Sequence, residues 1–412
     1  MLSKLNRPTC VNFKLSMPCK RMRCMKPQNI FSRALLFCFF MSTVTFGQNL
    51  HVKLTERLVL GDDEDAANEY LFVSPQHICT DRQNNIYVAD KYSAQIRIFD
   101  QKGRFVKAIG QKGKGPGEFE DIAAMTIAHN NDLLIVDRLN RRFTRFRKFG
   151  SDFIMYSIPV QSTIDPFFMQ PFGRRAFILG YLAGPITDDA NSMRNVDMFH
   201  IYTNDFRSIK ESCISATDIW NFNNRFERAQ SRANSLNCAV VDSNSIIVAP
   251  KFYEGILYKY EKVSNIWKMT KVQGKVPYKK SYDERPATKT NVRSDIENAR
   301  KSGHNFMILT DKDRRYFVYV RNRSVGLFQL NNGQIVHFSI MENDKDKAIF
   351  GLDIFTKNGK HTGYGEMKHF PLRGNDVFGI KVLWKDVNDH FYISDTRDIP
   401  VIRCFSLQYN VK

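Results

Sequence analysis

The sequence lacks every local motif that would identify a common class of enzyme. It contains no G-x-S-x-G nucleophile elbow and no H-E-x-x-H zinc motif, and no C-x-x-C pair occurs. The nine histidines are scattered, without the spacing of metal ligands. Enzymes that carry a local signature are therefore excluded. An enzyme that assembles its site from distant segments is not excluded.

Long apolar runs are also scarce, and the one in the first 47 residues, Ala34–Met41, is too short to span a bilayer. Eight Lys/Arg and no acidic residue accompany it, and Thr45-Phe46-Gly47 follows. A basic region, a short apolar run and small residues predict a secretory signal peptide over 1–47. A disordered basic tail is the alternative, and translation could begin at Met22 or Met25 instead. We expect a periplasmic or extracellular protein without a membrane span.

Removing this leader lowers the formal net charge from +19 to +11, which still favours anionic partners in general. Four of the eight cysteines leave with the leader. The other four are expected to be buried as small apolar residues, although an oxidising compartment would also allow Cys213 and Cys238 to close the segment between them. The four are Cys79, Cys213, Cys238 and Cys404.

Helical periodicity is absent from residues 77–119, where short β-rich runs alternate with Asn, Asp and Gly turns. Asn84–Asp90 matches Asn131–Asp137 at an offset of 47 residues, and later residues keep that offset. A period in the forties with about four strands per repeat predicts the blades of a β-propeller. The fold class is thus all-β, with a short helical insert.

Weaker copies of the second strand of this repeat recur along the chain, and they predict six blades over 77–412, with seven as the alternative. The fifth copy is the least certain, because 321–365 holds more β-rich runs than one blade needs. We expect the lead-in segment 48–76 to close the ring by joining the C-terminal strand near Ile402–Leu407. The copies after the first two are Phe177–Tyr181, Asp242–Ala249, Arg315–Val320 and Asp389–Asp395.

The runs Asn84–Asp90, Ile98–Phe105 and Gly110–Phe119 resemble those of NHL-repeat proteins, and more narrowly a family of secreted bacterial six-bladed propellers. The resemblance covers 77–150 and 350–405 best. It implies a fold and is nearly silent on function, since propellers host binding modules, lyases, lactonases and RNA readers.

Several residues are predicted to shape turns. An aspartate follows the second strand in three blades, where its carboxylate can accept bonds from nearby backbone N–H groups; a ring of carboxylates holding a cation is the alternative. Glycines between the first two blades supply positive φ angles. These structural residues are Asp90, Asp137, Asp395, Gly113, Gly115 and Gly117.

Candidate binding residues come from a basic run and from two inserts. Arg138 begins a stretch in which arginine and phenylalanine alternate; nucleic acid is one reading of it, but an acidic ligand fits export better. The insert 214–236 contains Trp220. The insert 275–304 contains Tyr282 and a predicted helix over 291–303, with acidic residues early and basic residues late. We expect Arg138, Trp220 and Tyr282 to contribute to binding, unless the inserts only cover blade edges.

Together these observations predict an exported binding or interaction module, more a binder than an enzyme, which takes a protein or glycan at the central depression. A metal-dependent propeller hydrolase or lyase, similar to lactonases in architecture, is the alternative. No cofactor is predicted, and a divalent cation in the central channel belongs to the enzyme alternative. We expect a monomer that does not bind nucleic acid.

Overall fold

The structure is a computed structural model in which the expected signal peptide, residues 1–47, lies outside the described part. The described residues are 48–61, 68–147, 152–157, 166–181, 197–224, 227, 236–287, 293–294, 296–297, 305–311, 314–343, 345, 347–367, 370, 379–396 and 399–411.

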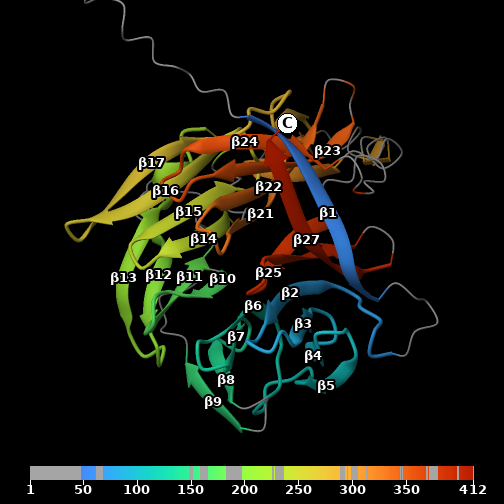
Figure 1. The fold of residues 1–412 in the computed structure, drawn as a ribbon, viewed down its shortest axis with the longest axis vertical. Coiled ribbons are helices and arrows are strands. Elements are labelled where there is room, and N and C mark those ends of the chain that lie inside the picture. The colour runs from blue at the N-terminus through green and yellow to red at the C-terminus, as the bar shows by residue number, and fades with distance from the viewer. Residues whose placement is uncertain are drawn as a thin grey trace, which may run out of the picture. The chain divides into compact units, whose positions relative to one another are not determined.

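Four separate four-stranded antiparallel sheets and one eight-stranded sheet make up most of the described chain. The eight-stranded sheet consists of two four-stranded blades joined by the parallel pairing of β24 with β1, so the protein is a six-bladed β-propeller, as the repeat predicted (Figure 1). We number the blades 1 to 6 in chain order. Blade 1 contains β2 (Pro75–Thr80), β3 (Ile86–Asp90), β4 (Gln95–Phe99) and β5 (Phe105–Ile109). Blade 2 contains β6 (Ile122–Ile127), β7 (Leu133–Asp137), β8 (Arg142–Arg147) and β9 (Asp152–Ser157). Blade 3 contains β10 (Pro166–Pro171), β11 (Ala176–Tyr181), β12 (Asp197–Thr203) and β13 (Ile209–Ser215).

The second half of the ring follows the same plan. Blade 4 contains β14 (Leu236–Asp242), β15 (Ser245–Pro250), β16 (Ile256–Val263) and β17 (Ile266–Gln273). Blade 5 contains β21 (Arg323–Gln329), β22 (Ile335–Glu342), β23 (Ala348–Phe355) and β24 (His361–Glu366). Blade 6 contains β25 (Ile380–Lys385), β26 (His390–Asp395), β27 (Val401–Val411) and, from the start of the described chain, β1 (Gln48–Leu60).

Strand β1 joins the two ends of the propeller. It pairs antiparallel with β27 from Leu50 to Leu60, and its first two residues also pair with β24 of blade 5. The lead-in segment therefore supplies the outer strand of the last blade. This pairing covers the long edge of β27, which would otherwise be open to other strands.

The repeated turn between the first and second strands has a local cause. Asn84, Asn131 and Asp389 have φ angles of 59°, 65° and 59°, which asparagine and aspartate tolerate better than most residues. In blade 1 the carboxylate of Asp81 accepts hydrogen bonds from the backbone N–H groups of Gln83 and Asn85. Asp386 does the same in blade 6. The turn predicted from the sequence thus recurs in the first and the last blade.

The main hydrophobic core of the described residues consists of six clusters, one between each pair of neighbouring blades. In β7, Ile135 packs against blade 1, whereas Leu134 and Val136 pack against blade 3. Successive side chains of a strand point to opposite faces, so both faces of this strand are buried. That explains why the second strands are continuous apolar runs. Because one cluster lies between blades 6 and 1, the ring closes at six.

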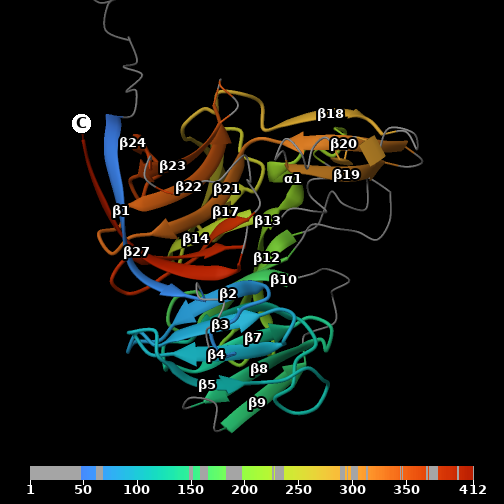
Figure 2. The same ribbon diagram turned by 90° about the vertical axis from the view of Figure 1, so that its right-hand side faces the viewer.

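The second strand predicted for the fifth blade was wrong, because the predicted residues belong to another sheet. The run Arg315–Val320 belongs to β20 (Arg314–Val320), which forms a separate sheet with β18 (Tyr282–Pro286) and β19 (Asn305–Asp311) (Figure 2). The second strand of blade 5 is β22, all of whose residues are buried. Both runs are β-rich, but only β22 can bury two faces between neighbouring blades. The separate sheet instead packs on Phe252 through one apolar cluster.

The inserts are only partly described. One short helix, α1 (Ala216–Ile219), follows β13 in the first insert. Of the helix predicted over 291–303, four described residues are helical, namely Arg293, Ser294, Ile296 and Glu297. The cysteines outside the leader are all buried and free, so Cys213 and Cys238 form no disulfide with each other.

Candidate functional site

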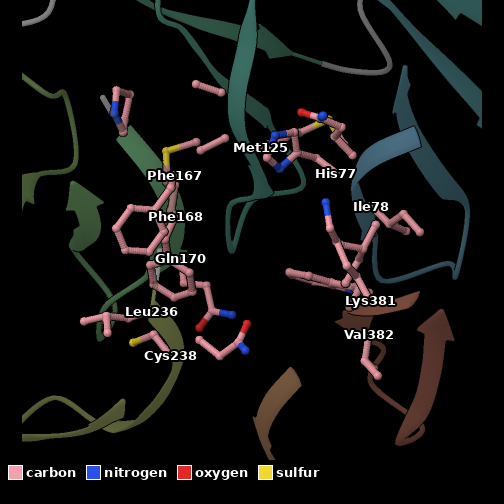
Figure 3. Close-up of a pocket in the computed structure, with 18 of the residues that line it drawn as sticks. His77, Ile78, Met125, Phe167, Phe168, Gln170, Leu236, Cys238, Lys381 and Val382 are labelled. Atoms are coloured by element: carbon pink, nitrogen blue, oxygen red, sulfur yellow. The ribbon is translucent and has the colours of Figure 1, made fainter. Parts of the chain in front are cut away.

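A pocket of about 490 Å³ lies where the first strands of the six blades converge. All six of these inner strands, β2, β6, β10, β14, β21 and β25, contribute to its wall (Figure 3). It is therefore the central depression expected of the fold.

Five of the inner strands carry a β-bulge at the pocket. In each, one residue is skipped in the pairing with the second strand, and every skipped residue lines the pocket. A bulge turns a side chain out of the regular alternation and is frequent near functional sites. The bulges thus direct extra side chains into the cavity. They lie at Gln76, Ala123, Phe167, Val325 and Leu383.

The pocket wall is strongly basic. Five cationic side chains and one histidine line it, against a single carboxylate, that of Asp121. Asp121 is already engaged, since its Oδ2 lies 2.5 Å from Nη2 of Arg138. The basic lining residues are His77, Lys91, Arg138, Lys251, Arg323 and Lys381.

The backbone gathers these charges at one end of the inner strands. Lys91, Arg138 and Lys251 each follow the second strand of a blade, next to the point where the inner strand begins. The N–H of Lys91 donates to the carbonyl of Ser74, and the N–H of Arg138 donates to the carbonyl of Asp121. Arg323 and Lys381 are the first and second residues of β21 and β25. The position after the second strand thus carries a cation in blades 1, 2 and 4, and the start of the inner strand carries one in blades 5 and 6.

Within the part of the chain that the structure describes, no carboxylate forms an ion pair with Lys251 or Lys381. Burial, together with the charges of Arg323 and Lys381, lowers the pKa of Lys251 to about 7. Burial, Arg323 and Lys91 lower the pKa of Lys381. Burial and Lys381 also lower the pKa of His77 to about 4, although Asp121 acts in the opposite direction. Positive charge in the pocket is therefore poorly compensated.

An apolar wall faces the basic groups. Phe167 and Phe168 line the pocket from β10, and Met125 lies beside them. Figure 3 shows the amine of Lys381 reaching into the cavity on the side of His77, with the two phenylalanines across from it. The pocket thus offers a charged side and an aromatic side.

The aspartates after the second strands position the basic residues. The carboxylate of Asp90 accepts hydrogen bonds from the N–H groups of Val73, at 2.7 Å, and Tyr92, at 3.1 Å. Asp137 accepts bonds from the N–H of Asp121, at 3.1 Å, and from Nδ2 of Asn140, at 2.6 Å. Each aspartate ties the start of an inner strand to the end of the second strand.

The third aspartate, Asp395, and the glycine loop are the remaining residues predicted to shape turns. Asp395 ends β26 at the same blade position as Asp90 and Asp137. In the loop between blades 1 and 2, Gly113 and Gly117 have positive φ angles of 156° and 75°, as predicted, whereas the φ angle of Gly115 is not positive. The N–H of Gly115 donates to Glu118, and the guanidinium of Arg142 donates to carbonyl groups of Lys114, Gly115 and Glu118.

A buried polar network extends from the pocket wall, which Asn237 and Ser324 line, into blade 5. Nδ1 of His337 lies 3.3 Å from Oδ2 of Asp353, and Nε2 of His337 lies 2.9 Å from Oγ of Ser324. Ser324 also accepts a bond from Nδ2 of Asn237, at 2.8 Å. The carboxylate of Asp353 further accepts bonds from His361, from the Lys275 N–H and from the Tyr253 hydroxyl. Burial would raise the pKa of Asp353, but the bonds and charges of the two histidines outweigh it and lower that pKa.

Serine, histidine and aspartate in this order are also the groups of hydrolase triads. Here Ser324 is 1% exposed, and His337 and Asp353 are 0% exposed. Ser324 borders the central pocket, but its side chain is almost fully buried and its hydroxyl already bonds the Asn237 amide as well as His337. We therefore interpret the network as a framework that joins blades 4 and 5 and holds β21 in place.

Of the three residues predicted to bind, only Arg138 lines the central pocket. Trp220 is 3% exposed and packs in the core between blades 3 and 4, where it also borders a second pocket beside α1. Tyr282 is half-buried on β18, near Glu227 of the other insert, and burial raises the pKa of its phenol. The two inserts thus approach each other away from the central pocket.

Sequence reasoning missed most of the basic cluster, although part of its signal was present. Lys91 and Arg138 are 47 residues apart, and Lys251 occupies the same blade position after Pro250. Comparing the residue after each second strand would have found all three. Arg323 and Lys381 had no such signal, because their exposure to the pocket depends on the bulges and on the true fifth blade.

Comparison with known proteins supports the fold. A family model described as a six-bladed β-propeller matches residues 65–156. A member of the DUF4221 family from Bacteroides vulgatus is similar in structure, with a TM-score of 0.55 and 12% identity, over 87% of this chain and 99% of that one. A Bacteroides fragilis protein thought to be exported has a TM-score of 0.46 and 11% identity, over 88% of this chain and 95% of that one. Virginiamycin B lyase from Staphylococcus aureus has a TM-score of 0.43 and 10% identity, over 86% of this chain and 99% of that one. No curated protein matches the sequence.

The described residues contain no group of three or more His, Cys, Asp or Glu side chains placed to hold a metal ion. None of their helices has the length and apolar character needed to cross a membrane.

Proposed function

We propose that this protein is an exported β-propeller binding module that takes a ligand in its central pocket. Export is supported by the predicted signal peptide over 1–47. We also infer an NHL-type relationship, supported by the runs Asn84–Asp90 and Gly110–Phe119.

The observation that carries the proposal is the construction of the pocket itself. Five bulges direct side chains into one cavity at the meeting point of six blades. A cavity of about 300–1,000 Å³ with mostly apolar walls and a few polar groups is the usual form of a ligand site. A ring built only for stability would gain nothing from bulges, which interrupt its hydrogen bonding.

The alternative, a metal-dependent hydrolase or lyase, fits this pocket poorly. Divalent cations in proteins bind carboxylate, amide or imidazole groups. The one carboxylate on the wall, Asp121, is paired with Arg138, and nearby lysines would repel a cation. We therefore derive no catalytic step through a metal.

Blocking the cavity tests the proposal. Ala123 is the bulged residue of β6 and is half-buried on the pocket wall, so Ala123→Trp should fill the cavity without changing its charge. We expect this variant to fold and to lose binding of ligands detected by thermal shift and calorimetry, from a panel of acidic and neutral sugars and small aromatic acids. Val106→Trp, on the exposed surface of β5, is the matched control. Unchanged binding by Ala123→Trp would refute a site in the central pocket.

A further inference from the structure

We propose that the ligand of the central pocket is a small organic anion, whose acidic group binds Lys251, Arg323 and Lys381 and whose apolar body lies against Phe167 and Phe168. This inference rests on the proposed function and adds the chemical class of the ligand.

The first argument is the uncompensated charge. Lys251 and Lys381 are half-buried, so both ammonium groups are partly removed from water. Burying a cation without a counter-charge costs free energy, and proteins normally pair such groups. Lys251 and Lys381 have no carboxylate partner among the described residues, and both have lowered pKa values because of burial and mutual repulsion. A bound anion would supply the missing charge.

The cations also come from separate blades. Lys251 follows β15 of blade 4, Arg323 begins β21 of blade 5, and Lys381 lies on β25 of blade 6. The N–H of Ser324 donates to the carbonyl of Lys251, which fixes two of these segments together. Convergence from three blades is difficult to explain by the stability of any one blade. It matches a site in which several donors surround one acidic group.

The second argument is the opposite wall. A bare inorganic anion would leave most of the 490 Å³ cavity and its aromatic side unused. The bulge in β10 lets adjacent residues Phe167 and Phe168 both border the cavity, across from Lys381 (Figure 3). Aromatic faces favour flat or apolar groups. The ligand that fits both sides carries one acidic group on an apolar or ring-shaped body.

Three compounds test whether the pocket binds both an acidic group and an apolar ring. The compounds are 3-phenylpropionate, with both features, 3-phenylpropionamide, with the ring but no charge, and acetate, with the charge but no ring. We expect 3-phenylpropionate to bind the wild-type protein at least about tenfold more tightly than either other compound, the loss expected when a charged hydrogen-bonding group is removed. Ligand-observed NMR and calorimetry would measure the dissociation constants.

Two variants locate the charge. Lys251→Met and Lys381→Met keep an unbranched apolar side chain of nearly the same length and remove the ammonium group. Each should weaken binding of 3-phenylpropionate by about tenfold while leaving the weak binding of the amide unchanged. Both should melt at or above the temperature of the wild type, because repulsion is relieved. Lys53→Met, on the exposed surface of β1, should change neither property.

The outcomes separate the two proposals. Equal affinity for 3-phenylpropionate and its amide would overturn the anion inference and leave a neutral-ligand pocket. The same holds if the lysine variants lose stability but keep their affinity, which would make the cations structural. Failure of every compound to bind, together with no effect of Ala123→Trp on any tested ligand, would instead overturn the proposed function.

Discussion

At the scale of single residues, the charge state of Lys251 is the most informative feature. Burial and two neighbouring cations lower its pKa to about 7, whereas the pKa of a lysine in the unfolded chain is about 10.4. Between these values the unfolded chain binds more protons than the folded chain. Stability therefore increases with pH across this window, and below it the full cost of the buried charge is present.

This sign can be tested with Lys251→Met, which cannot titrate. We expect the variant to be more stable than the wild type at about pH 6, and the difference to shrink by about pH 9 as Lys251 loses its proton in the folded state. Urea unfolding at both pH values measures it. A difference that stayed constant, or that grew with pH, would contradict the lowered pKa.

At the scale of elements, the fifth blade depends on the buried polar network that extends from the pocket wall. Asp353 on β23 accepts bonds from two histidines, one hydroxyl and one backbone N–H. Asp353→Ala would leave these buried donors without an acceptor. We expect it to lower the free energy of unfolding by about 3–5 kcal/mol, as for other broken buried pairs. Asp205→Ala, in an exposed turn, is the control for denaturant unfolding, and a similarly small effect at Asp353 would show that the network is dispensable.

The pH dependence of that network has the same sign as that of Lys251, since both pKa values are lowered, but it falls in the acidic range. Because the pKa of Asp353 is lowered in the folded state, its contribution is present above the usual carboxyl pKa. The contribution is lost as the pH falls through the lowered value.

The elements also show how far the sequence could be interpreted. Five of the six predicted second strands are blade strands, because burial on both faces produces an unmistakable apolar run. β20 was misassigned because a β-rich run does not reveal which sheet it joins. The bulges at Ala123 and Phe167 left no sequence signal, since a skipped residue changes pairing and not composition. Those bulges determine which side chains reach the pocket, so the sequence could reveal Lys91, Arg138 and Lys251 by their shared blade position but not the rest of the site.

At the scale of the whole propeller, stability depends on closing the ring. β1 covers β27 from Leu50 to Leu60, and β27 would otherwise expose an edge of up to eleven residues. Removing residues 48–60 should therefore cause association or loss of soluble protein. Light scattering coupled to size-exclusion chromatography would detect it. A truncated protein with the same oligomeric mass and melting temperature as the protein that keeps residues 48–60 would show that ring closure is not needed.

The central claim is that the pocket binds an organic anion, and paired calorimetric titrations of wild-type protein with 3-phenylpropionate and 3-phenylpropionamide test it most directly. The two compounds share the ring and differ in charge. The account predicts at least about tenfold tighter binding of the carboxylate. Equal binding of the two, or tighter binding of the amide, would contradict it.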